Sequence, residues 1–201
     1  MELFTLLMLI AISAYALKSR DQNKRIALLG HHLGQHQIEK LMEDLANGYL
    51  RALGETDPQR QTQIWNILST SETALCGQFN RLATEFSKVS EADARVSKLA
   101  LALPYANQLF PDATFDMRAA LRLHAQGLTQ VAQNEQNKSP KDKAFTLSAE
   151  LFLMQHTCHW FCRSKTVASA RLMARHKTTY EQLLAAVSPQ TRTAYLALTA
   201  R

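Results

Sequence analysis

The stretch AFTLSAELFLMQHTCHWFC, residues 144–162, decides the fold. Wound into a helix, it carries apolar side chains on every side, and Glu150 is its only formally charged residue. A helix that is apolar all round is normally the buried helix at the centre of a bundle. A second membrane segment is the alternative, but Glu150, Gln155 and His156 are costly to insert into lipid. We therefore expect an all-α fold, a multi-helix bundle whose central apolar helix lies near residues 140–163.

Prolines preceded by capping side chains mark the starts of further helices. Asp57, Ser139 and Ser188 each stand directly before a proline, which is the arrangement of an N-cap followed by the first helical residue. Near the C-terminus, Thr178 with Glu181 predicts a capping box.

Between these marks the apolar residues recur with the period of a helix. Residues 33–49 carry one such stripe, and a second repeats every seven residues after Pro58. The second stripe consists of Leu68, Leu75, Leu82 and Val89. The segment between Pro104 and Pro111 reads as an irregular connection. No segment of strand length alternates between apolar and polar residues, so the sequence predicts no strand.

The first seventeen residues, MELFTLLMLIAISAYAL, are uncharged from residue 3 onward. About fifteen helical residues rise roughly 22 Å, against a hydrocarbon core of about 30 Å. The two residues before the run and a snorkelling Lys18 close part of that gap. We predict a transmembrane signal-anchor over residues 1–18 and a helical bundle domain over residues 19–201. A signal peptide cleaved after Ala14-Tyr15-Ala16 and a core or interfacial helix are the alternatives.

A cluster of cations follows the apolar run, and only Glu2 is charged before it. The flanking cations are Lys18, Arg20, Lys24 and Arg25. Because Lys and Arg collect on the cytoplasmic side of a span, a retained anchor places the N-terminus outside and the C-terminal domain in the cytoplasm. The three cysteines form an odd number, so no complete disulfide framework is available, which fits a reducing compartment.

The chain has a formal net charge of +6, and a second basic segment contributes to it. This segment contains Arg163, Lys165, Arg171, Arg175, His176 and Lys177. Spread over one to two helical lengths, these cations predict a face for anionic lipid or an acidic partner, with a merely solvated helix face as the plain alternative. Aromatic residues do not alternate with them, so we expect no nucleic-acid partner.

The motif HTCHWFC is the sharpest candidate for chemistry. On a helix, Cys158, His159 and Cys162 share one face, and thiolate and imidazole are ligands that zinc and soft transition metals prefer. One helix offers at most two or three ligands, so Cys76 or His124 would have to complete the site. The alternative is that the cysteines act as small buried hydrophobes and His159 bonds a carbonyl.

Two further histidine patterns qualify as weaker candidates. His32, His36 and Glu39 would share a helix face that could hold a divalent ion, with His31 beside them. His124 lies within an apolar helix face, where a phosphotransfer histidine could stand. The residues after His124 do not match such a site, so a core histidine is the preferred interpretation.

These observations favour a membrane-tethered helical interaction protein, such as a scaffold, an adaptor or an accessory subunit. Its expected partners are the membrane, through the N-terminal helix, and a protein of unknown identity or a second copy of the chain. No cofactor is expected unless the metal site exists. One alternative is a metal- or haem-binding redox or sensor protein built on His156, Cys158, His159 and Cys162. Another is an enzyme acting on a membrane-derived substrate, although no familiar catalytic motif occurs.

Overall fold

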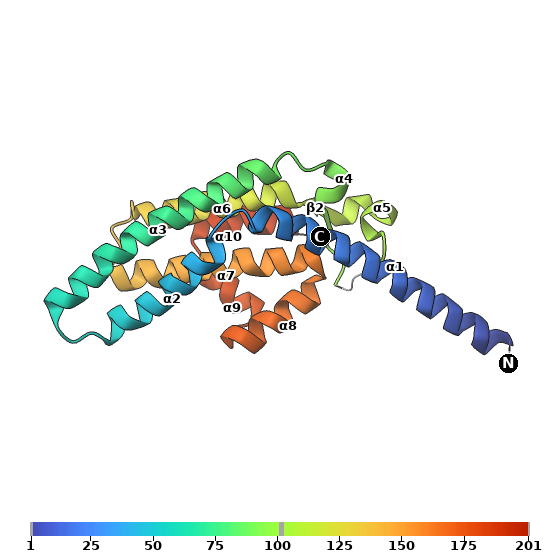
Figure 1. The fold of residues 1–201 in the computed structure, drawn as a ribbon, viewed down its shortest axis with the longest axis horizontal. Helices are drawn as coiled ribbons and strands as arrows, with labels where there is room; N and C mark the ends of the chain where they lie inside the picture. The colour runs from blue at the N-terminus through green and yellow to red at the C-terminus, as the bar shows by residue number, and fades with distance from the viewer. Residues whose placement is uncertain (1, 101–102, 201) are drawn as a thin grey trace.

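The structure is a computed structural model that describes residues 2–100 and 103–200. Over these ranges the chain forms ten α-helices, one 3-10 helix and two short strands (Figure 1). The helices are α1 (Glu2–Leu33), α2 (Ile38–Gly54), α3 (Pro58–Phe86), α4 (Glu91–Ala94), α5 (Ala106–Leu109), α6 (Met117–Gln133), α7 (Pro140–Cys162), α8 (Lys165–His176), α9 (Tyr180–Ala186) and α10 (Pro189–Thr199). The other elements are β1 (Arg95–Ser97), η1 (Pro111–Ala113) and β2 (Thr114–Asp116). The prediction of a mostly helical protein is confirmed.

Helix α7 lies at the centre of the bundle, where the sequence places it. It contacts α1, α2, α6, α8 and α9, and its buried residues include Glu150 and His156 as well as its apolar side chains. Burial on several sides explains why the helix has no single apolar face. The orange α7 ribbon in Figure 1 runs between its neighbours along the length of the domain.

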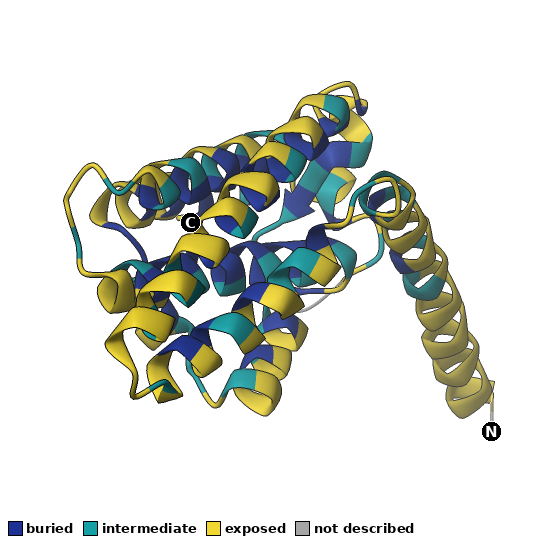
Figure 2. Ribbon diagram, turned by 60° about the vertical axis from the view of Figure 1, so that its left-hand side comes forward, coloured by how far each residue is buried: buried dark blue, intermediate teal, exposed yellow. Residues whose placement is uncertain are grey.

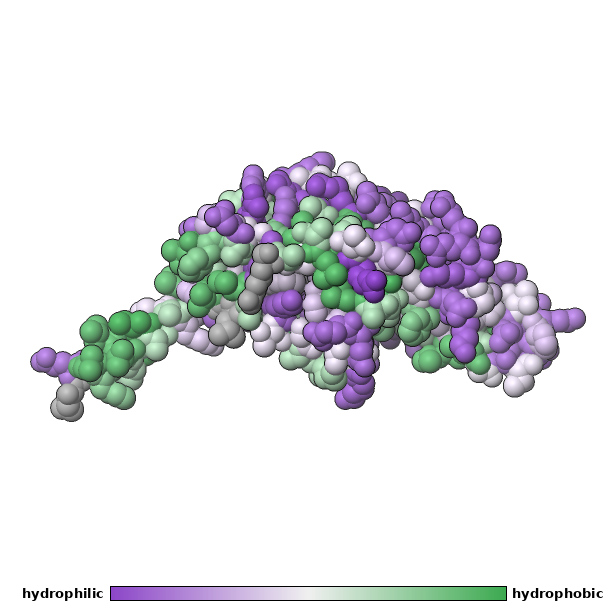
Figure 3. All heavy atoms as spheres, turned by 180° about the vertical axis from the view of Figure 1, so that it is seen from behind, coloured by the Kyte–Doolittle hydropathy of each residue, from purple (hydrophilic) through white to green (hydrophobic). Residues whose placement is uncertain are grey.

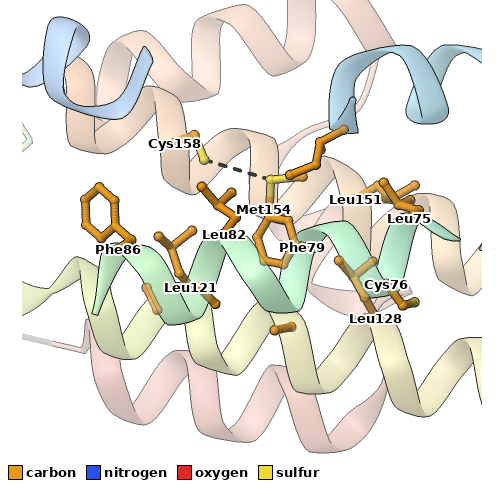
Figure 4. Close-up of a cluster of buried hydrophobic side chains, with 14 of the residues drawn as sticks. Leu75, Cys76, Phe79, Leu82, Phe86, Leu121, Leu128, Leu151, Met154 and Cys158 are labelled. Carbon is orange, nitrogen blue, oxygen red and sulfur yellow. Dashed lines mark hydrogen bonds between the residues drawn. The ribbon is translucent and has the colours of Figure 1, made fainter. Parts of the chain in front are cut away.

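The long helix α3 supplies the other half of the main core. Leu75, Phe79 and Leu82 are fully buried, and they face α6 and α7 across the core (Figure 4). The stripe of seven-residue spacing is therefore confirmed as a buried face within this chain. Its last member, Val89, lies beyond the end of α3 but is also buried.

The predicted N-caps form as the sequence indicates. The side chain of Asp57 accepts a hydrogen bond from the Gln59 amide at 2.8 Å, and Ser139 and Ser188 cap α7 and α10 in the same way. The capping box near the C-terminus is one residue later than predicted.

In the capping box, Thr179 pairs with Gln182, and both reciprocal bonds are present. Thr178 is unavailable as a cap because its hydroxyl donates to the carbonyl of His176 at 2.9 Å. It does so in the turn where Lys177 adopts a left-handed conformation.

The apolar stripe over residues 33–49 does not form one helix. Helix α1 ends at Leu33, and α2 begins only at Ile38, so the chain reverses between them. Helices α2 and α3 then pack side by side as a hairpin. Gly48 permits a close approach, because a Cβ there would lie 2.3 Å from a methyl carbon of Leu68.

The prediction of no strand is wrong for two short segments. Strands β1 and β2 pair antiparallel, with Val96 opposite Phe115, and both side chains are buried. Each strand has only three residues, too few for a period of two to show in the sequence. The irregular connection between Pro104 and Pro111 contains the one-turn helix α5.

Helix α1 projects from the rest of the molecule. Its N-terminal half extends beyond every other element in Figure 1 and is exposed along its length in Figure 2. Its C-terminal half lies against α7 and α3.

Candidate functional site

Helix α1 consists of a free half and a packed half. Every residue from 2 to 17 is exposed, and Phe4 exposes 74% of its surface. Burial begins at Lys18, and Gln22 and Leu29 are buried. The change from free to packed thus coincides with the first cation after the apolar run.

In the part of the chain that the structure describes, α1 is the one helix long and apolar enough to cross a membrane. Retained anchors and signal sequences both have this form. In Figure 3 its apolar half stands out as a green projection at one end of the molecule.

Polar contacts fix the packed half of α1 to the domain. The Arg25 guanidinium donates to Asp21 Oδ2 at 3.2 Å and to the carbonyl of Arg95 at 2.9 Å. Its central carbon also lies 5.4 Å from the ring centroid of Phe161, a cation–π contact. The bond to Arg95 holds α1 against β1 and the contact with Phe161 holds it against the end of α7, whereas the pair with Asp21 lies within α1 and orients the guanidinium.

Two further contacts extend this attachment. Gln22 Oε1 accepts a hydrogen bond from Arg163 Nη1 at 2.5 Å. Lys24 pairs with Asp93 at 2.5 Å, and the bonded Lys24 ammonium holds the pKa of the Asp93 carboxyl below its usual range.

The four predicted flanking cations therefore divide into two pairs. Lys24 and Arg25 attach α1 to the domain, whereas Lys18 and Arg20 make no ion pair with any residue that the structure describes.

The predicted metal ligands have other contacts. Cys158 is buried and its Sγ lies 3.8 Å from Met154 Sδ (Figure 4). Burial raises the pKa of Cys158 and raises that of Cys162 to about 11. His159 Nδ1 lies 3.1 Å from Arg171 Nη1, and burial lowers its pKa.

Cysteine binds a metal as a thiolate, so a metal would have to displace the protons of these two thiols, whose pKa values burial has raised. Over the described residues, no group of three or more His, Cys, Asp or Glu side chains is arranged to hold a metal ion. The proposed extra ligands lie elsewhere, with Cys76 on α3 and His124 on α6. The metal site stays a prediction that these contacts do not support.

His156, the fourth residue of the predicted metal- or haem-binding cluster, also has partners within the protein. Its Nε2 lies 3.1 Å from the Ser169 hydroxyl, and its ring stacks on Tyr180 at a centroid distance of 4.8 Å. Burial lowers the pKa of His156 to about 3, so it is neutral at physiological pH.

The expectation that His32, His36 and Glu39 share one helix face is wrong, because His32 lies in the last turn of α1, His36 in the following turn and Glu39 in α2. His36 lies in the turn before α2, where its ring nitrogens contact Glu85 Oε2 at 3.0 Å and Gln78 Oε1 at 3.2 Å. His32 packs edge-on against Phe86. These residues join the α1–α2 turn to α3.

His124 is fully buried, as the preferred interpretation expects. Its Nε2 lies 2.9 Å from the Thr157 hydroxyl, and burial lowers its pKa to about 3. A neutral, inaccessible imidazole does not suit phosphotransfer.

The predicted basic segment is divided rather than continuous. Lys165 covers two aromatic rings, with its ammonium 5.2 Å from the Trp160 centroid and 4.5 Å from that of Tyr180. Lys177 follows the end of α8. Arg171 and Arg175 line a hollow of about 390 Å³ between α7 and α8.

A second hollow, of about 350 Å³, joins this one at His159 and Arg171. We call it the α1–α7 groove. Its apolar side chains come from three helices and are Ile26, Leu29, Leu33, Ile38, Met42 and Met154. Arg163, Arg171 and Glu39 add charge to it. The sequence suggests Cys158, His159, Cys162 and the arginines separately, whereas only the fold shows that they border one apolar groove.

Two buried acidic residues have partners that the sequence did not indicate. Glu72 accepts a hydrogen bond from Tyr49 at 2.7 Å and pairs with Lys143 of α7. Glu150 accepts two bonds from Ser188, from its amide at 3.0 Å and its hydroxyl at 2.7 Å. Glu72 thus joins α3 to α2 and α7, and Glu150 joins α7 to the start of α10.

Comparison of the chain with known protein families, with curated proteins and with solved structures finds no significant match.

Proposed function

We propose that the protein is a membrane-tethered helical interaction protein, a scaffold, adaptor or accessory subunit that holds a partner at the membrane surface. One observation carries the proposal. A single unbroken helix, α1, exposes all its apolar N-terminal residues, while its polar remainder is built into the domain. Water-exposed apolar surface of this extent is unfavourable, and a bilayer removes it.

The order of charges supports a retained anchor over a cleaved signal. A signal peptide carries cations before its apolar run, whereas here the only preceding charge is Glu2 and the cations follow. With the cations on the cytoplasmic side, the N-terminus lies outside and the domain lies in the cytoplasm.

The α1–α7 groove is the surface we propose for the partner. An amphipathic helix that lays apolar side chains into a groove is a common mode of recognition. Arg163 bonds Gln22 and Arg171 lies beside His159, but neither has a carboxylate partner among the described residues. Their positive charge beside the apolar face favours a partner with acidic side chains. The groove is also bordered by α1, which keeps the bound partner close to the membrane.

Alkaline carbonate extraction of native membranes, followed by N-terminal sequencing, tests the tether. We expect the full chain to sediment with the membranes and to retain the residues before Lys18. Release into the supernatant, or a mature chain that begins near Leu17, would contradict the proposal. A reporter fused after residue 201 should be active in the cytoplasm, and activity only outside would reverse the orientation.

Photocrosslinking tests the partner surface. A photoreactive amino acid at Met42, in the groove, should give an adduct in native membranes that Arg171→Glu diminishes. The control is Leu50 on the same helix, which exposes 71% of its surface outside the groove and should give no such adduct. Equal labelling at both positions, or none at Met42, argues against the groove.

A further inference from the structure

The segment that contains α5 is unusually apolar for an exposed surface. No charged residue occurs from Leu99 to Pro111. Leu109 exposes 65% of its surface, and three further large side chains in this segment are exposed as well. We call these four residues the α5 patch: Leu103, Tyr105, Leu109 and Phe110.

The fold holds α5 so that these side chains point outward. Ala106 is buried beneath the helix, where α5 contacts β1. The side-chain amide of Asn107 donates to the carbonyl of Ala92 at 3.2 Å. Tyr105 adopts a left-handed backbone conformation, with φ of 55°, as the chain enters the helix. The inner face of α5 therefore packs on the domain, whereas its outer face is exposed and no described residue covers its apolar side chains.

The α5 patch lies beside α1 near Lys18, where the apolar run of that helix ends. Leu103, Ala106 and Asn107 line the same small hollow as Lys18 and Asp21. In Figure 1, α5 lies at the end of the domain from which α1 projects, and Figure 3 shows a second green area at this end. The two apolar surfaces are thus neighbours, at about the level of Lys18 along α1.

The length of the apolar run brings this end of the domain to the lipid. The run rises roughly 22 Å, which is about 8 Å short of the hydrocarbon core. A short span is accommodated by local thinning and by drawing its flanks toward the headgroups. Lys18 is then at the lipid interface, and the neighbouring α5 patch is there with it.

We propose that the α5 patch is a second membrane contact, inserted into the interfacial region of the leaflet at which α1 emerges. This inference rests on the proposed tether and extends it from one point of attachment to two. Tyrosine, phenylalanine and leucine are suited to this region, where aromatic rings sit at the headgroup level. Lys18 beside the patch, and Arg20 further along α1, attract anionic headgroups.

Quenching by brominated lipid tests the contact with the full chain in phosphatidylcholine and phosphatidylglycerol vesicles. Three single substitutions add a tryptophan: Leu109→Trp in the patch, Leu9→Trp in the apolar run, and Leu50→Trp on α2 as the control. Each signal is taken as the difference from the unsubstituted protein, which contains Trp65 and Trp160. We expect brominated lipid to remove about half of the added emission at Leu109 and at Leu9, and none at Leu50.

The three positions separate the two proposals. Quenching at Leu9 without quenching at Leu109 overturns the second contact and leaves the tether standing. No quenching at Leu9 overturns the tether. Blue-shifted emission at Leu109 that brominated lipid does not quench shows that protein covers the patch, which also overturns the inference. Phe110→Trp, an aromatic exchange at an exposed position, repeats the measurement should Leu109→Trp misfold.

Discussion

At the scale of the residue, Gly127 lies where α6 passes closest to the buried carboxylate of Glu150. A Cβ at this position would lie 2.4 Å from Thr191 Oγ1 and 2.9 Å from Glu150 Oε2. Gly127→Ala should therefore lower the free energy of unfolding by about 2 kcal/mol, because the neighbours are held in place by hydrogen bonds. Chemical denaturation in mild detergent measures the change.

A second helical glycine provides the matched control. Gly77, on the exposed side of α3, has no atom within 4 Å of the Cβ that would be added. Gly77→Ala should raise the free energy of unfolding by about 0.5–1 kcal/mol, since alanine favours the helix. Equal effects at the two positions would show that the close approach at Gly127 does not exist.

The buried histidines make stability depend on pH. His124 and His156 have pKa values lowered to about 3 by burial, against 6.5 when exposed. Below pH 6.5 these two imidazoles bind protons in the unfolded chain but stay neutral in the folded protein. The free energy of unfolding therefore falls as the pH drops. Each histidine contributes up to about 1.4 kcal/mol per pH unit. Glu150 acts in the opposite direction, because burial raises its pKa and the folded protein protonates it first.

Replacing one histidine isolates its share of this dependence. Between pH 6.5 and 5, the free energy of unfolding should fall less steeply in His156→Asn than in the unsubstituted protein. The two slopes should differ by at most about 1.4 kcal/mol per pH unit. Between pH 7 and 8 the variant and the unsubstituted protein should show the same pH dependence. An unchanged slope below pH 6.5 would mean that His156 protonates in the folded state.

At the scale of the element, α1 depends on Arg25 for its attachment. Arg25→Ala removes the pair with Asp21, the bond to the Arg95 carbonyl and the contact with Phe161. We expect the free energy of unfolding to fall by about 2 kcal/mol and the amide hydrogens in the packed half of α1 to exchange faster.

Arg20 is the matched control for this element. It is exposed on the same helix and makes no ion pair with a described residue. Arg20→Ala should leave both the denaturation midpoint and the hydrogen exchange of α1 unchanged. A similar loss in the two variants would indicate a general effect of charge rather than the contacts of Arg25.

The elements show what the sequence could predict and what it could not. The start of α7 after Ser139 and its central position follow from local capping and from composition, both readable within one segment. The turn after Leu33 is held by His36, which bonds Glu85 on a different helix, and the uninterrupted apolar period gives no sign of this non-local contact. The strands form because Val96 and Phe115 meet across a connection, which local periodicity does not report.

The candidate site was predictable in part for the same reason. Spacing along α7 correctly places Cys158, His159 and Cys162 close together, and all three border the α1–α7 groove. The contact of Cys158 with Met154 is also local to α7. The apolar wall from α1 and α2 is not local, so nothing in HTCHWFC indicates that the motif borders a groove.

At the scale of the whole molecule, the exposed half of α1 contributes nothing to the folded domain. Deleting residues 2–17 should leave the denaturation midpoint unchanged and make the domain extractable without detergent, because none of these residues is buried. Deleting residues 2–33 should destabilise it strongly, since Leu29 and the contacts of Arg25 are lost. Circular dichroism during denaturation compares the two truncations.

Helix α1 contains no proline and runs from Glu2 to Leu33 without a flexible linker. The domain consequently cannot swivel independently of its anchor. Under the proposed tether, a partner that rotates the domain would also rotate α1 about its long axis, so a twist applied to the domain would be transmitted along the helix into the bilayer.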